Sequence, residues 1–279
     1  MSVTNYFLPQ SLYEALILLE EHKDALLVMG GGTVTMPLIN EGVSAPEQVM
    51  GLRQTGLNYI QQGNGQVVIG ATTTLSQILE ASPIPLLGEA ARNSAGWTIR
   101  NMATVGGNFF VPPPAGDFAT ALLALDAEVK LVSQGQERFV PVADFYTGFM
   151  ANVLQPDELL AEIKVPVPQG QTAFIKFGRK VANTPAVVTV AAHLQFEGDL
   201  VQAARIAMNA VGPHPIRARN AEESLLGSSL DDAVISEAAS AAAEECQPFT
   251  DAVASEWYRR KMVEVYVGRV LKKIAGKEG

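Results

Sequence analysis

Two glycine-rich runs constrain this sequence more than any other feature. The later run, residues 98–108, ends in Gly-Gly-Asn directly after a β-branched pair. Because glycine has no Cβ, main-chain N–H groups in such a run can point at one place and bind an anion, most often a phosphate. The earlier run, residues 28–33, places three glycines after the apolar segment 25–28. Two such cradles, far apart in sequence, predict one dinucleotide held between two lobes.

Each run by itself also fits a tight turn or a β-bulge, and these alternatives stay open at the level of the sequence. Neither run matches the usual nucleotide fingerprints. No Gly-x-Gly-x-x-Gly opens a helix, and no Gly-Lys-Ser/Thr follows a glycine loop. The Rossmann and P-loop folds are therefore disfavoured.

Composition excludes some classes of partner. The 279 residues can form one large domain or two to three small ones with a substantial core. A net charge of -9 argues against nucleic acid as a partner. It does not exclude a phosphate ligand, because main-chain N–H groups bind anions without lysine or arginine.

Cysteine and histidine usage argues against metal chemistry in this chain. The single cysteine, Cys246, cannot form an intrachain disulfide or hold an iron–sulfur cluster, and we expect a buried or incidental thiol. The histidines His22, His193 and His214 lack ligand spacing, so no metal site is expected. The sequence shows no signal peptide and no apolar run long enough to span a membrane, so we expect a cytoplasmic protein.

Hydrophobic periodicity predicts the elements of the first part of the chain. Strands are expected at 26–29, 67–71 and 127–132 and within 158–165. Helices are expected after the N-cap Ser11, near 36–39, from a threonine cap at 72–74 through Leu79, from residue 86 onward, and at 118–124. Pro166 and Pro168 mark the best domain boundary. Further on, strands at 186–196 and 203–211 flank a hairpin turn at Gly198, and helices follow at 220–226, 231–245 and 257–274. This last part predicts an α+β domain of three strands and several helices.

Ordered motifs along essentially the whole chain match one family pattern. They are Gly30-Gly31-Gly32-Thr33 with Met36-Pro37, residues 70–75, residues 99–108, Asp117, Leu125-Asp126-Ala127, residues 157–160 before Pro166, and Gly212-Pro213 with Pro215 and Arg217. Together they resemble the FAD-binding medium subunit of the molybdenum hydroxylases, the group of xanthine dehydrogenase and aerobic carbon monoxide dehydrogenase. The resemblance implies an α+β fold: a two-lobed PCMH-type FAD-binding domain, with lobes at 1–53 and 54–168, and a C-terminal domain of the carbon monoxide dehydrogenase flavoprotein type at 169–279.

The resemblance also implies which residues contact FAD. The diphosphate would be cradled by Val28, Met29, Gly30, Gly31, Gly32, Thr33, Val34 and Thr35 together with Thr104, Val105, Gly106, Gly107 and Asn108. Asp117 would bond the adenosine ribose or a neighbouring polar group, Leu160 would pack on the cofactor, and Lys176 would lie near the ring or its chain. Further cofactor-binding residues would be Thr72, Ser94, Ile99 and Ala103. No catalytic acid, base or nucleophile is expected from the side chains.

Three features of the sequence bear on these assignments. Asp117 could instead cap the helix that begins at Phe118. Val34 stands where the family often has a polar or acidic residue, which would remove one side-chain contact to the flavin chain. The run Pro112-Pro113-Pro114 is unusual for the family and could alter the loop before Asp117.

In the family, a molybdenum–pterin centre on a large subunit oxidises the substrate. Electrons then pass through two [2Fe–2S] clusters on a small subunit to FAD, and on to NAD, oxygen or a quinone-type acceptor. The resemblance therefore implies an oxidoreductase subunit that carries only the flavin and needs both partners. Two alternatives are a non-catalytic flavin-binding assembly module and a stand-alone flavin reductase of the same fold, which would need a side-chain proton donor.

Overall fold

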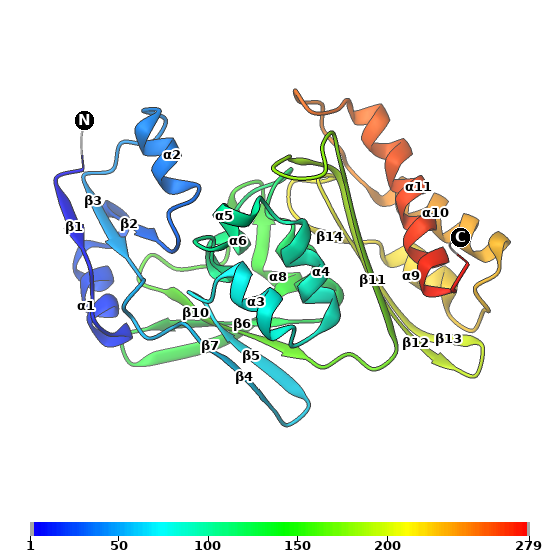
Figure 1. Cartoon of the computed structure of the whole chain (residues 1–279), viewed down its shortest axis with the longest axis horizontal. Coiled ribbons are helices and arrows are strands. Elements are labelled where there is room, and N and C mark those ends of the chain that lie inside the picture. The colour runs from blue at the N-terminus through cyan, green and yellow to red at the C-terminus, as the bar shows by residue number, and fades with distance from the viewer. Residues whose placement is uncertain (1–2, 278–279) are drawn as a thin grey trace.

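A small parallel sheet opens the computed structural model, which describes residues 3–277 (Figure 1). Its strand order is β1-β3-β2. The elements of this first lobe are β1 (Asn5–Phe7), α1 (Leu12–His22), the 3-10 turn η1 (Lys23–Ala25), β2 (Leu26–Met29), α2 (Thr35–Asn40) and β3 (Gln48–Gly51). Ser11 caps α1 as predicted, accepting a hydrogen bond from the Glu14 N–H. Strand β2 ends directly before Gly30, so the first glycine run lies at the carboxyl end of a parallel strand.

A five-stranded antiparallel sheet, in the order β4-β5-β10-β6-β7, forms the base of the second lobe. Its strands are β4 (Ile60–Gly63), β5 (Gln66–Gly70), β6 (Glu128–Ser133), β7 (Gln136–Pro141) and β10 (Leu159–Pro166). Short helices lie on one side of it in Figure 1: α3 (Leu75–Ala81), α4 (Pro85–Asn93), α5 (Trp97–Arg100), α6 (Val105–Phe109), α7 (Phe118–Ala124) and α8 (Val142–Phe145). The apolar side chains of all of these helices except α5 form a common core with the sheet. A small hairpin, β8 (Tyr146–Gly148) with β9 (Ala151–Asn152), completes the lobe.

The C-terminal part is a four-stranded sheet in the order β11-β12-β13-β14, packed against three helices (Figure 1). Its elements are β11 (Gln171–Gly178), β12 (Ala186–Glu197), β13 (Leu200–Asn209), β14 (Ile216–Arg217), α9 (Arg219–Leu225), α10 (Asp232–Glu245) and α11 (Glu256–Ile274). The predicted count of three strands is therefore corrected to four. The fourth strand, β14, has two residues, which is too short to leave a periodic pattern in the sequence.

Helix α7 joins the second lobe to the C-terminal sheet. All seven of its residues are buried, because α7 packs against β12 and β13 as well as against the helices of its own lobe. This burial explains why the segment is apolar on every side. Asp117, at the N-cap position of α7, is thereby placed where the two parts of the chain meet.

Several further observations bear on the sequence predictions. The helix predicted at 118–124 and the strand predicted at 26–29 are confirmed. Cys246 is buried, and burial raises the pKa of its thiol. Within residues 3–277, no helix is long and apolar enough to cross a membrane, and no group of three His, Cys, Asp or Glu side chains is arranged to hold a metal ion.

Candidate functional site

The two glycine runs lie against each other, and this contact defines the site. A Cβ on Gly31 would overlap the carbonyl oxygen of Met102, and a Cβ on Gly30 would lie 2.6 Å from Thr104 Oγ1. Glycine is therefore required at both positions by close approach of the second run. Gly32 adopts a φ of +72°, which L side chains rarely adopt, and it turns the chain from β2 toward α2.

The first run offers unused donors. Within residues 3–277, the N–H groups of residues 31–34 donate no hydrogen bond to the protein. These four consecutive groups precede α2 and belong to residues that line a cavity. Adjacent free N–H groups are suited to an anion such as a diphosphate.

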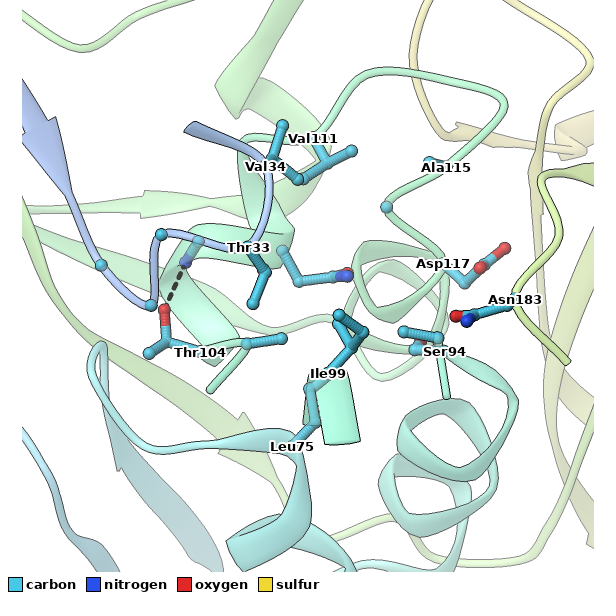
Figure 2. A pocket seen from close by; sticks show the side chains of 18 of the residues that line it. Thr33, Val34, Leu75, Ser94, Ile99, Thr104, Val111, Ala115, Asp117 and Asn183 are labelled. Atoms are coloured by element: carbon cyan, nitrogen blue, oxygen red, sulfur yellow. Dashed lines mark hydrogen bonds between the residues drawn. The ribbon is translucent and has the colours of Figure 1, made fainter. Parts of the chain in front are cut away.

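The second run differs from its prediction, because the N–H groups of residues 105–108 are already bonded. Val105 N–H donates to Thr73 O at 2.8 Å, and Gly106 N–H donates to Ala71 O at 2.9 Å. Gly107 N–H donates to Thr104 Oγ1 at 3.0 Å, the bond drawn in Figure 2. The expectation that these groups converge on an anion is therefore wrong for this structure. The physical reason is that residues 105–109 form helix α6, whose first turn is satisfied by its cap and by the segment after β5.

A cavity of about 290 Å³ lies between the first lobe, the second lobe and the C-terminal sheet. Figure 2 shows Thr33 and Val34 on one side of it and Ser94, Asp117 and Asn183 on the other. Most of the predicted cofactor-binding residues line it: Gly30, Gly31, Gly32, Thr33, Val34, Thr35, Ser94, Ile99, Ala103, Thr104, Gly107, Asn108, Asp117 and Lys176. Residues from three separate parts of the chain thus meet at one place.

A second cavity, of about 330 Å³, shares Gly30, Gly31 and Thr104 with the first. It is lined in addition by Arg53, Asn58, Thr72, Thr74, Asn101 and Met102. The Thr72 hydroxyl is buried and has no hydrogen-bond partner among residues 3–277. A buried hydroxyl without a partner is costly, and this one belongs to a residue that lines the second cavity. The two cavities are thus adjacent, with the contact between the glycine runs as a shared wall.

Five predicted residues do not line either cavity. Val28 and Met29 lie within β2, and Val105 and Gly106 are buried in α6 against the segment after β5. Leu160 lies in β10 and is buried in the core between the sheet and its helices. All five residues thus lie within strands or a helix of the fold, and none of them is part of a cavity wall.

Asp117 is held by a buried ion pair. Its Oδ2 lies 2.6 Å from Lys176 Nζ, and its Oδ1 accepts a hydrogen bond of 2.7 Å from the Thr189 hydroxyl. The side chains of Lys176 and Asp117 are 9% and 4% exposed, so the pair is shielded from solvent. The alternative role for Asp117, a side-chain cap of α7, is not observed, because the Phe118 N–H donates instead to Asn108 Oδ1.

Sequence reasoning missed several residues that line the site. Asn183, Thr184 and Pro185 come from the loop between β11 and β12, and the Asn183 side chain accepts a hydrogen bond of 2.8 Å from the Gly96 N–H. No local sequence pattern predicts that this loop lines the site, because tertiary packing alone brings it close to the cavity. Asn101 lies within the motif at 99–108, whereas Arg53 lies at the end of the predicted first lobe, and the polar character of each was the available signal.

Comparison with known families agrees with this geometry. The chain belongs to the family described as the FAD binding domain in molybdopterin dehydrogenase, which matches residues 2–168, and residues 172–274 match the CO dehydrogenase flavoprotein C-terminal domain. It is thus a flavoprotein subunit of the molybdenum hydroxylase type, an oxidoreductase component whose cofactor is FAD.

Individual relatives cover nearly the full chain. The glyceraldehyde dehydrogenase medium chain of Sulfolobus acidocaldarius is 31% identical over 97% of this chain and 98% of its own length. The xanthine dehydrogenase FAD-binding subunit of Escherichia coli O157:H7 is 27% identical, over 99% of this chain and 97% of its own. The solved carbon monoxide dehydrogenase of Hydrogenophaga pseudoflava superposes with a TM-score of 0.94 at 29% identity, covering 99% of this chain and 98% of that chain.

Proposed function

We propose that this chain carries FAD as the electron-transfer subunit of a molybdenum hydroxylase. It would receive electrons from [2Fe–2S] clusters of a small subunit and pass them to NAD, oxygen or a quinone. A large molybdopterin-binding subunit would oxidise the substrate. Support comes from relatives named as a medium chain and as an FAD-binding subunit, which are names of components of larger enzymes. The observation that carries the cofactor assignment is the set of free N–H groups at residues 31–34 beside the shared wall of two cavities.

FAD fits the chemistry of both cavities. We assign the diphosphate to the N–H groups of residues 31–34, where the cavities meet. The second cavity, with Arg53, Asn58 and the Thr72 hydroxyl in its lining, suits the hydroxyls and polar edges of the ADP half. The first cavity suits the flavin half, since Lys176 places a cation there and a nearby positive charge tunes the electronics of a flavin.

This assignment revises the expected role of Asp117. Both of its carboxylate oxygens are engaged by protein groups, Lys176 and Thr189, so we assign it to holding Lys176 rather than to the adenosine ribose. We assign each remaining lining residue to the half of FAD that would occupy its cavity. When bound, FAD supplies the redox chemistry, and the side chains bind and orient it.

A stand-alone reductase would need a proton donor beside the flavin. Among the described residues that line the first cavity, Asp117 and Lys176 carry the titratable side chains, and they are paired with each other. The Ser94 hydroxyl donates to Ala90 O at 2.8 Å. The arrangement therefore favours a subunit that passes electrons over an enzyme that also protonates a substrate.

The visible spectrum of the full chain tests the proposal, both alone and co-expressed with its large and small partner subunits. We expect flavin absorption in the purified protein and its loss in Gly31→Asp, because the added side chain would overlap Met102. Gly63→Asp is the matched control, since a Cβ there meets nothing within 4 Å. A wild-type protein that takes up no FAD in either form would overturn the proposal.

A further inference from the structure

A row of polar side chains crosses the C-terminal sheet at the edge of the FAD site. Lys176 on β11 pairs with Thr189 on β12, and Thr189 pairs with Asn209 on β13. Two residues along each strand, on the same face, the corresponding positions are Phe174, Ala191 and Ala207, which are buried in the core around α7. The row is thus the polar end of an otherwise apolar face. We call Lys176, Thr189 and Asn209 the polar row.

All three members of the polar row bind the second lobe. Thr189 Oγ1 donates to Asp117 Oδ1 at 2.7 Å, and Asn209 Nδ2 donates to Ala115 O at 2.9 Å. Lys176 Nζ bonds Asp117 Oδ2 at 2.6 Å and Asn93 O at 3.2 Å. Thr189 and Asn209 are fully buried, so their polar groups do not contact solvent. Three neighbouring strands therefore hold the short segment 115–117, which lines the first cavity.

The hydrogen bonds of the Lys176 ammonium leave one of its N–H donors unused. An ammonium has three N–H donors, and two of those on Lys176 are used by Asp117 and Asn93. Because Lys176 lines the cavity, the third is available to a bound ligand. The direction of that donor depends on Asp117, and the position of Asp117 depends on Thr189.

We infer that Thr189 and Asn209 are positioning residues, which fix segment 115–117 and so hold the Lys176 ammonium against the flavin. This inference rests on the proposed function. A fixed cation stabilises the negative charge that the flavin ring gains on reduction, so it raises the midpoint potential of bound FAD. The C-terminal domain thereby sets the potential of a cofactor that is otherwise bound by the two lobes.

Thr189→Val tests the inference, because it removes the hydroxyl and keeps the shape of the side chain. The measurements are the midpoint potential of bound FAD, equilibrated with a dye of known potential, and the affinity for oxidised FAD. We expect binding of reduced FAD to weaken relative to oxidised FAD by about tenfold, as for one charge-assisted hydrogen bond, which lowers the two-electron potential by about 30 mV. Thr189→Ser, which retains the hydroxyl, should restore the wild-type potential.

Thr120→Val is the matched control. Thr120 is equally buried and lies in the first turn of α7, and its hydroxyl has no partner among residues 3–277. A wild-type potential in Thr189→Val, or an equal shift in Thr120→Val, would overturn the inference. If Thr189→Val does not fold, Asn209→Ala must lower the potential for the inference to survive. A wild-type chain that binds no FAD would refute the proposed function instead, so the two failures are distinguishable.

Discussion

Replacing Lys176 by methionine should destabilise the protein far more than the loss of a surface ion pair. The substitution keeps most of the side-chain volume and removes the charge that faces Asp117. The Asp117 side chain is 4% exposed and would retain its hydrogen bond from Thr189 alone. Breaking a buried pair by removing one partner costs about 3–5 kcal/mol, because the other charge is left uncompensated. We therefore expect the free energy of unfolding to fall by about 3 kcal/mol or more.

Urea unfolding of the apoprotein, followed by circular dichroism, measures this loss. The double variant Lys176→Met with Asp117→Asn should recover much of the stability, because it removes the uncompensated carboxylate. Lys261→Met is the surface control: its pair with Glu264 has side chains 57% and 43% exposed, so the expected loss is about 0.5 kcal/mol or less. Equal losses in Lys176→Met and Lys261→Met, or no recovery in the double variant, would refute the reasoning.

Two further variants test separate features. Thr72→Val removes a buried hydroxyl that has no partner in the protein, so the affinity for FAD should fall about threefold to tenfold. The melting temperature of the apoprotein should stay the same or rise. The control is Thr120→Val, outside both cavities, which should leave FAD titrations unchanged. The Arg138 guanidinium beside Glu158, with help from a backbone N–H, lowers the pKa of that carboxyl. The Glu158 carboxylate therefore stabilises the fold above the ordinary glutamate pKa of about 4.3, and this stabilisation is lost as the pH falls toward the lower pKa of the folded state. Urea midpoints measured against pH should show this loss in the wild type and not in Glu158→Gln.

Much of the architecture follows from local sequence patterns. The apolar stretch at 118–124 and the caps at Ser11 and Thr74 specify helix positions through hydrogen bonds within a few residues. The glycines of the first run also mark the place where the two runs approach each other, since Gly30 and Gly31 leave no room for a side chain there.

The rest depends on contacts between distant segments. The second run could not be distinguished from an anion cradle, because the N–H groups of Val105 and Gly106 are satisfied by distant carbonyls, which only the fold brings near. The polar row was equally hidden: Thr189 and Asn209 lie in long apolar strands, and their partners are 72 and 94 residues away. Register between strands, which no single strand encodes, lines them up.

The burial of helix α7 bears on how the chain unfolds. Its surrounding core contains Phe174, Ala191 and Ala207 of the C-terminal sheet together with the helices of the second lobe. The prolines at 166 and 168 therefore separate two topological units whose apolar residues meet at α7, while the C-terminal unit also has a core of its own. Cutting the chain there would leave an apolar side of α7 uncovered and invite aggregation.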